Sequence, residues 1–213
     1  MKIVWLGKLA VLAAVVCLSS WASADDGHRN HFASILLDGK KIGQVHYSVK
    51  YDEQGELEHL KTKASLSVLF VKLYDFTQDL HEQWSGGELQ SMRGSTNDDG
   101  KTYEIDLKRT PTEYEATLND KLLILPHDAF PMSLWHYAVT RHTLLFDLSN
   151  LRLLNVKVSG HEDTVARSGE TIAAERFDFV GDWKGSVWFD RDRQFLKAEY
   201  VSNKRLVTVV VDP

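Results

Sequence analysis

The sequence predicts a mainly β protein: an antiparallel meander of about a dozen strands with one short helix packed against the sheet. Three observations lead to this prediction. Apolar and polar residues alternate with a period of two along most of the chain. Turn residues separate these segments at short, regular spacing. A single stretch, residues 125–146, interrupts the alternation.

The expected strands follow the alternation in chain order. The clearest is Ile42–Tyr51, in which Val45, Tyr47 and Val49 alternate with polar residues and so indicate one buried face. The full set is Phe32–Leu37, Ile42–Tyr51, Leu60–Phe70, Phe76–Trp84, Leu89–Thr96, Tyr103–Leu107, Tyr114–Leu118, Lys121–Leu125, Leu151–Val158, Ile172–Val180, Gly185–Asp190, Phe195–Ser202 and Arg205–Val211.

The interruption has the features of a helix entry. Two prolines bracket its first part, and Ser133 occupies the place of a helix N-cap. From there Leu134, Trp135, Ala138 and Val139 recur at helical spacing. We therefore expect about two turns of helix, with Leu134 and Trp135 buried against the sheet.

The first 24 residues have the features of an export signal. Lys2 and Lys8 give a positively charged start, residues 9–18 are apolar, and Ala22-Ser23-Ala24 offers small residues at the cleavage positions. We therefore expect cleavage after Ala24, a periplasmic protein, and one β-rich domain over residues 25–213.

The chain has one cysteine, Cys17, which lies inside this signal. It follows Val16 rather than a small residue, and the cleavage site lies just downstream, so we expect cleavage rather than lipidation. Because cleavage removes the cysteine, the mature protein must be held together without disulfides.

Composition excludes several function classes. The formal net charge is −5, and removing residues 1–24 takes away two lysines and no acidic residue, which makes it −7. A mildly acidic chain without a basic run is a poor candidate for binding nucleic acid. The apolar run of the signal is too short to be a membrane anchor, so we expect no transmembrane segment after its removal.

Five short motifs follow one another along the chain: Asp38-Gly39-x-x-Ile42-Gly43, Glu82-x-Trp84-x-x-Gly87-x-Leu89, Thr96-Asn97-Asp98-x-Gly100, Pro131-x-Ser133-x-Trp135 and Trp188-Phe189-Asp190. In this order they resemble a family of exported proteobacterial proteins known only as a domain of unknown function. Where that family often has a threonine and an asparagine beside the Ser-x-Trp core, this chain has Met132 and His136.

The family is distantly similar to open, strongly curved β-sheet proteins such as the periplasmic lipoprotein carriers and their receptors. The resemblance implies a strongly curved sheet, a half-barrel or open barrel, with the helix over its concave face. In those proteins the concave face is apolar and takes acyl chains, so the resemblance also suggests a lipid or another apolar small molecule as ligand.

A single short helix cannot cover the concave side of such a sheet, so we expect a cleft there. The residues predicted to edge it are Trp84, Phe130, Leu134 and Trp135, with Glu82 at its polar end. Glu82 shares an otherwise apolar strand face with Gln78. It is either a buried ion-pair partner of Arg93 or a contact for a ligand head group.

No pattern predicts a catalytic residue, a metal site or a cofactor. The chain has nine histidines, but His136 and His142 are six residues apart and do not have the spacing of zinc ligands on a helix. Residues 97–100, Asn-Asp-Asp-Gly, lack the alternating acids of a calcium loop and indicate a hairpin turn instead.

Three functions remain open. The first is binding of an acyl chain or similar ligand in the cell envelope. The second is hydrolysis by Asp128, Ser133 and His136, although no nucleophile elbow surrounds the serine. The third is an envelope-assembly protein with a filled core. An open apolar cleft favours the first, a Ser–His hydrogen bond the second, and a packed interior the third.

Overall fold

The computed structural model describes residues 28–53, 55–68 and 71–213. The expected signal peptide, its cleavage site and Cys17 lie outside the described residues. The same holds for Phe70 and for the side chain of Val68, at the end of a long expected strand.

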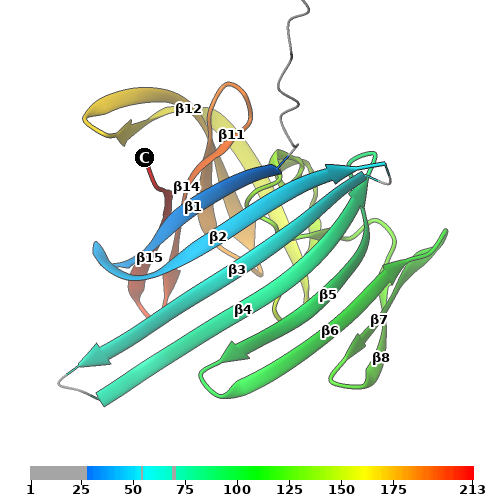
Figure 1. Cartoon of the computed structure of the whole chain (residues 1–213). Coiled ribbons are helices and arrows are strands. Elements are labelled where there is room, and N and C mark those ends of the chain that lie inside the picture. Colours follow the sequence, from blue (N-terminus) through cyan, green and yellow to red (C-terminus); the bar gives the residue numbers. More distant parts are fainter. Residues whose placement is uncertain (1–27, 54, 69–70) are drawn as a thin grey trace, which may run out of the picture.

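Fifteen strands form a single sheet in the described part of the chain (Figure 1). They are β1 (His28–Leu37), β2 (Lys40–Asp52), β3 (Gly55–Val68), β4 (Val71–Ser85), β5 (Glu88–Asp98), β6 (Lys101–Arg109), β7 (Glu113–Leu118), β8 (Lys121–Pro126), β9 (Phe130–Pro131), β10 (Leu144–Phe146), β11 (Leu153–Arg167), β12 (Glu170–Gly181), β13 (Gly185–Phe189), β14 (Phe195–Ser202) and β15 (Arg205–Val211). The mainly β fold class is confirmed.

The sheet is an antiparallel meander in which the first described strand, β1, pairs with the last, β15. Its order runs from β8 back to β1, continues through the pairing of β1 with β15, and runs back from β15 to β9. Apart from the parallel pair β9–β10, neighbouring strands are antiparallel. Figure 1 shows β1 to β8 as one curved wall with β11 to β15 behind it. The two edge strands of the sheet, β8 and β9, do not pair with each other, so the sheet is a barrel that does not close. These two strands are consecutive in the chain.

Tight turns of Asn, Asp, Ser, Lys and Gly connect many of the strands. Both turn residues have a positive φ at Asp38-Gly39, Gly86-Gly87, Asp99-Gly100, Asn119-Asp120, Ser168-Gly169 and Asn203-Lys204. This is the geometry of two-residue hairpins whose twist matches that of the flanking strands. The segment 97–100 is therefore a hairpin turn, as its sequence predicts.

One face of the sheet is apolar and lines the interior. Leu66, Phe76, Leu80 and Trp84 all belong to or pack against one large buried cluster, so these residues of β3 and β4 share the inner face. The cluster also contains side chains from the opposite wall, such as Phe179 of β12. The main core therefore lies between the two walls, on the concave side.

Residues 127–152, between β8 and β11, are here called the insert. The expected α-helix is replaced by a 3-10 helix, η1 (Tyr137–Arg141), whose N-cap residue is His136 and not Ser133. The backbone before Ser133 is held extended, because Phe130–Pro131 pairs with β10 and the Met132 N–H donates to the Phe146 carbonyl at 2.9 Å. Ser133 starts a single turn, closed by the His136 N–H that donates to the Ser133 carbonyl at 3.3 Å. The extended backbone of His136 (φ −99°, ψ 112°) then separates this turn from η1, so no longer helix forms.

The insert lies inside the concave face, as expected, and contacts both walls. The Trp135 ring stacks on Tyr47 of β2 at 4.7 Å between centroids and meets the Phe195 ring of β14 edge-on at 5.1 Å. The Tyr137 ring meets Phe177 of β12 edge-on at 5.5 Å. Aromatic contacts of this kind fix the distance between the walls.

The far end of β11 was not predicted, whereas β12 agrees with the predicted strand Ile172–Val180 to within two residues. The polar run 159–167 continues β11, and with the start of β12 it packs against the other face of the sheet. There a second, smaller cluster forms around Trp188, with Val165, Ala174 and Leu196. The Trp188 indole N–H donates to Asp163 at 2.8 Å. This second cluster explains why β13 has an apolar residue, Trp188, on its outer face.

Candidate functional site

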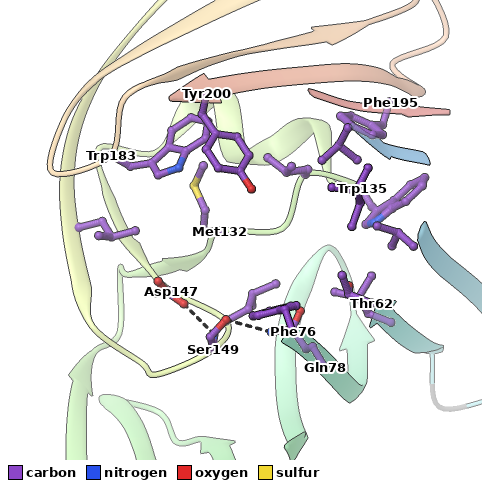
Figure 2. A pocket seen from close by; sticks show the side chains of 17 residues that line it. Thr62, Phe76, Gln78, Met132, Trp135, Asp147, Ser149, Trp183, Phe195 and Tyr200 are labelled. Carbon is purple, nitrogen blue, oxygen red and sulfur yellow. Dashed lines mark hydrogen bonds between the residues drawn. The ribbon is translucent and has the colours of Figure 1, made fainter. Parts of the chain in front are cut away.

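A cavity of about 260 Å³ lies between the insert and the two walls (Figure 2). Its apolar lining comes from β1 to β4, from the insert, from β11, from the β12–β13 turn and from β14 and β15, and includes Leu60, Phe76, Met132, Leu134, Trp135, Trp183, Phe195 and Tyr200. Figure 2 also shows a polar corner, where Ser149 lies between Asp147 and Gln78. The Gln78 amide donates to Ser149 and to Thr96, each at 3.1 Å. The buried Gln78 is therefore hydrogen-bonded within the protein.

A second cavity, of about 530 Å³, adjoins the first and shares Ile35, Thr62, Phe76 and Tyr200 with it. Its inner part is apolar, whereas its remaining lining includes polar residues from the hairpin turns β5–β6 and β14–β15 and from the start of β4: Tyr74, Asp98, Asp99, Ser202, Asn203 and Arg205. Together the two cavities form what is here called the cleft. It is largely apolar, with a polar corner at Gln78 and Ser149 in the first cavity and polar residues at the far end of the second, and this combination suits an amphiphilic molecule.

The predicted site residues separate into two groups. Leu134 and Trp135 line the cleft. Trp84 is only 1 % exposed and packs deeper in the core, with its ring 5.7 Å from that of Phe130. Glu82 and Phe130 are also buried beneath the cleft lining. Contact of these three residues with a ligand remains a prediction.

The expected ion pair of Glu82 with Arg93 is wrong. Arg93 points to the outer face and pairs with Asp106 at 2.8 Å. Glu82 instead accepts a hydrogen bond from the Trp84 indole N–H at 2.9 Å. The reason is strand parity: Arg93 lies opposite the outward-facing His81 in the β4–β5 ladder, whereas Glu82 faces inward.

Glu82 belongs to a buried cluster, Glu58–Glu82–His136, that sequence reasoning did not identify. Glu58 of β3 and Glu82 of β4 are direct neighbours in the ladder, and each is only 3 % exposed. The insert supplies His136, whose Nε2 lies 2.9 Å from Glu58 Oε2 and whose ring stacks on Trp84 at 4.0 Å. Glu58 Oε1 is buried, and no residue in the described part of the chain lies within hydrogen-bond distance of it.

The environment shifts the pKa values of the cluster. Burial and, second, the charge of Glu58 raise the pKa of Glu82 to about 7. Burial lowers the pKa of His136, but the hydrogen bond to Glu58 and the charges of Glu58 and Glu82 outweigh it, and the net shift is upward. Burial, the Glu58 charge and a hydrogen-bond interaction with the Glu58 carboxylate also raise the pKa of the Tyr47 hydroxyl.

The geometry does not support a hydrolase. In the described part of the chain the His136 side chain is bonded to Glu58, and its link to Ser133 is a backbone one, from the His136 N–H to the Ser133 carbonyl at 3.3 Å. A serine nucleophile needs a side-chain base within hydrogen-bond reach, and His136 is committed elsewhere.

A second group of possible ligands lies on the outer face. His59, Asp79 and His81 bring their polar atoms within 4.8 Å of one another. The His59 and His81 rings stack at 4.0 Å, and Lys61 also reaches Asp79 at 3.5 Å. The group is largely exposed, and the ordinary pairing of surface charges explains it.

None of the described helices has the length and apolar character needed to cross a membrane.

Comparisons with known proteins agree with this architecture. The sequence model of a family described as a domain of unknown function (DUF6134) matches residues 34–212. Among solved structures, the chain is similar to a β-barrel-like protein with the domain of unknown function DUF1849 from Brucella abortus, with a TM-score of 0.60 and 11 % sequence identity, covering 86 % of this chain and 94 % of that one. No curated protein matches at a significant level. At this identity the likeness supports the fold alone.

Proposed function

The chain belongs to the DUF6134 family of domains of unknown function, and from this premise we propose that it binds an amphiphilic molecule with an acyl chain in the cleft. The observation that supports the proposal is the cleft itself, two adjoining cavities of about 260 and 530 Å³ on the concave face. These volumes lie near the range of about 300–1,000 Å³ that is usual for small-molecule sites.

The shape and polarity of the cleft favour an amphiphile over a wholly apolar ligand. An acyl chain in the apolar part would gain about 0.8 kcal/mol for each buried CH₂ before the cost of ordering. The head group would then lie near Tyr74, Asp98 and Asn203 at the polar end. A chain of about twelve carbons should bind with micromolar rather than nanomolar affinity.

The cleft can be tested with two Leu→Trp variants on the same strand. Leu66 of β3 lines the cleft, so the larger ring in Leu66→Trp should fill it and weaken binding of dodecanoic acid at least tenfold in calorimetric titration. Leu57 of the same strand faces outward and is 39 % exposed, so Leu57→Trp should bind within twofold of the unaltered protein.

Two results would contradict the proposal. Equal binding by Leu66→Trp and the unaltered protein would place the fatty acid elsewhere. Absence of binding, together with absence of lipid in native mass spectra of protein purified from its own envelope, would favour an assembly role with no ligand.

Export to the periplasm is part of the same proposal, and the features of residues 1–24 support it. Mass spectrometry of the mature protein should give an N-terminus at Asp25, because the small residues at positions 22 and 24 suit signal peptidase. A lipid-modified Cys17 at the N-terminus would contradict the predicted cleavage after Ala24 and indicate a membrane-anchored lipoprotein.

A further inference from the structure

The Glu58–Glu82–His136 cluster joins three elements that are distant in the chain. Glu58 and Glu82 come from the neighbouring strands β3 and β4, and His136 comes from the insert. One ligand atom of each residue lies within 4.8 Å of the others. Sequence spacing could not show this set, because 24 and 54 residues separate its members.

The charges of the cluster balance only when Glu82 holds a proton or when a further cation is bound. Two carboxylates are buried side by side, and in the described chain neither makes an ion pair with a lysine or an arginine. His136 is the one basic partner, and it bonds to a single oxygen of Glu58. Among the described residues, Glu58 Oε1 is buried and has no partner within hydrogen-bond distance, and the one further polar group that interacts with the Glu58 carboxylate is the neutral Tyr47 hydroxyl. Buried carboxylates are normally paired or bound to a metal, so this orphaned oxygen points to a missing ligand.

We propose that Glu58, Glu82 and His136 bind one divalent transition-metal ion, with Zn²⁺ as the best match. A divalent cation would neutralise both carboxylates and give Glu58 Oε1 a partner. An imidazole nitrogen with two carboxylate oxygens suits zinc, whereas Mg²⁺ and Ca²⁺ prefer oxygen ligands alone. This proposal does not depend on ligand binding in the cleft.

The distance between two of the three candidate ligand atoms is already near that of a zinc site. Two ligands of a tetrahedral zinc ion with bonds of about 2.1 Å lie about 3.4 Å apart, and His136 Nε2 lies 2.9 Å from Glu58 Oε2. The zinc would replace the proton between these atoms, and that proton would be released to solvent. Glu82 has to approach by a small side-chain movement.

The surrounding residues also resemble the outer shell of a metal site. The Trp84 indole N–H donates to Glu82 Oε2 at 2.9 Å, which orients that carboxylate. The Trp84 ring stacks on His136 and restricts the imidazole orientation. Such contacts keep ligands in position before the metal arrives. Three protein ligands would leave one zinc position for water.

The test is metal titration of the full mature protein, without a histidine tag and after chelation. Isothermal calorimetry with Zn²⁺ should show one ion per chain at micromolar affinity or tighter, with Mg²⁺ at least a hundredfold weaker. Co²⁺ should give the visible absorption of a four-coordinate site with nitrogen and oxygen ligands. Failure of the unaltered protein to bind zinc stoichiometrically would overturn the proposal.

Variants identify which cluster holds the metal. Glu58→Gln and, separately, His136→Asn should each weaken zinc binding at least tenfold. Asp79→Asn disables the exposed His59–Asp79–His81 group and should leave the affinity within twofold. The opposite pattern, with binding lost in Asp79→Asn and kept in the other two, would assign the metal to the outer face. Circular dichroism of each variant establishes that it is folded before titration.

Discussion

Replacing Trp84 by alanine should destabilise the protein by about 3–5 kcal/mol, because a side chain that is 1 % exposed is removed from the main core. The Trp84 ring contacts both Phe130 and His136 of the insert, so the cavity left behind would also loosen the insert. Thermal unfolding followed by calorimetry should show a decrease of about 6–20 °C in Tm, at about 2–4 °C per kcal/mol for a chain of this length.

Two control variants separate the causes of this loss. Trp84→Phe keeps most of the apolar volume but removes the N–H that donates to Glu82. It should cost about 1–3 kcal/mol, the penalty for leaving a buried polar atom without its partner. Leu122→Ala, at a β8 residue that is 84 % exposed, should change stability by less than about 0.5 kcal/mol. A Trp84→Ala loss as small as that of Leu122→Ala would show that Trp84 does not anchor the core.

The strand pattern could be predicted because it depends on local chemistry. Period-two alternation along Ile42–Tyr51 predicts one buried face, and in the structure Val45, Tyr47 and Val49 are all buried. Two-residue turns such as Asp38-Gly39 need positive φ values, which these residues tolerate. Where the local signal was weak, as in the polar run 159–167, the strand was missed because it is specified by pairing with β12 and by the outer cluster.

The helix type and the candidate sites depend on tertiary contacts. Ser133 has the residue type of an N-cap, but the turn that it begins ends at His136, whose extended backbone (φ −99°, ψ 112°) interrupts the helix. Strand parity alone places Glu58 on the inner face, with Leu60 and Thr62. Its position opposite Glu82 also requires the β3–β4 register, which includes a bulge at Leu66/Ser67 that the sequence does not reveal.

Replacing His136 by alanine should destabilise the metal-free protein by about 3–5 kcal/mol at pH 8, because the change leaves Glu58 and Glu82 buried without a cation. Chemical denaturation with a chelator present measures this loss independently of any metal. A loss below about 0.5 kcal/mol would indicate that water reaches the carboxylates.

The loss caused by His136→Ala should be smaller at pH 5 than at pH 8. The pKa of Glu82 in the folded protein, about 7, is above its ordinary value of 4.5, so the folded state binds that proton more tightly than the unfolded state. Stability from this group is therefore complete below about pH 4.5 and decreases as the pH rises through 7. The charge of His136 lowers the pKa of Glu82 in the intact protein, so this pKa is higher still in the variant. At pH 5 Glu82 is therefore neutral in the folded variant, and one buried negative charge remains instead of two.

The double variant Glu58→Gln/His136→Ala provides the matched control. It removes one carboxylate charge together with its cationic partner, so its loss at pH 8 should be less than that of His136→Ala alone. Such non-additivity between contacting residues is what a charge-pair origin requires. If the stability losses of the single variants Glu58→Gln and His136→Ala instead add up to that of the double variant, lost packing of the imidazole on Trp84 explains the His136 effect. The cluster then stabilises the insert by contact rather than by charge.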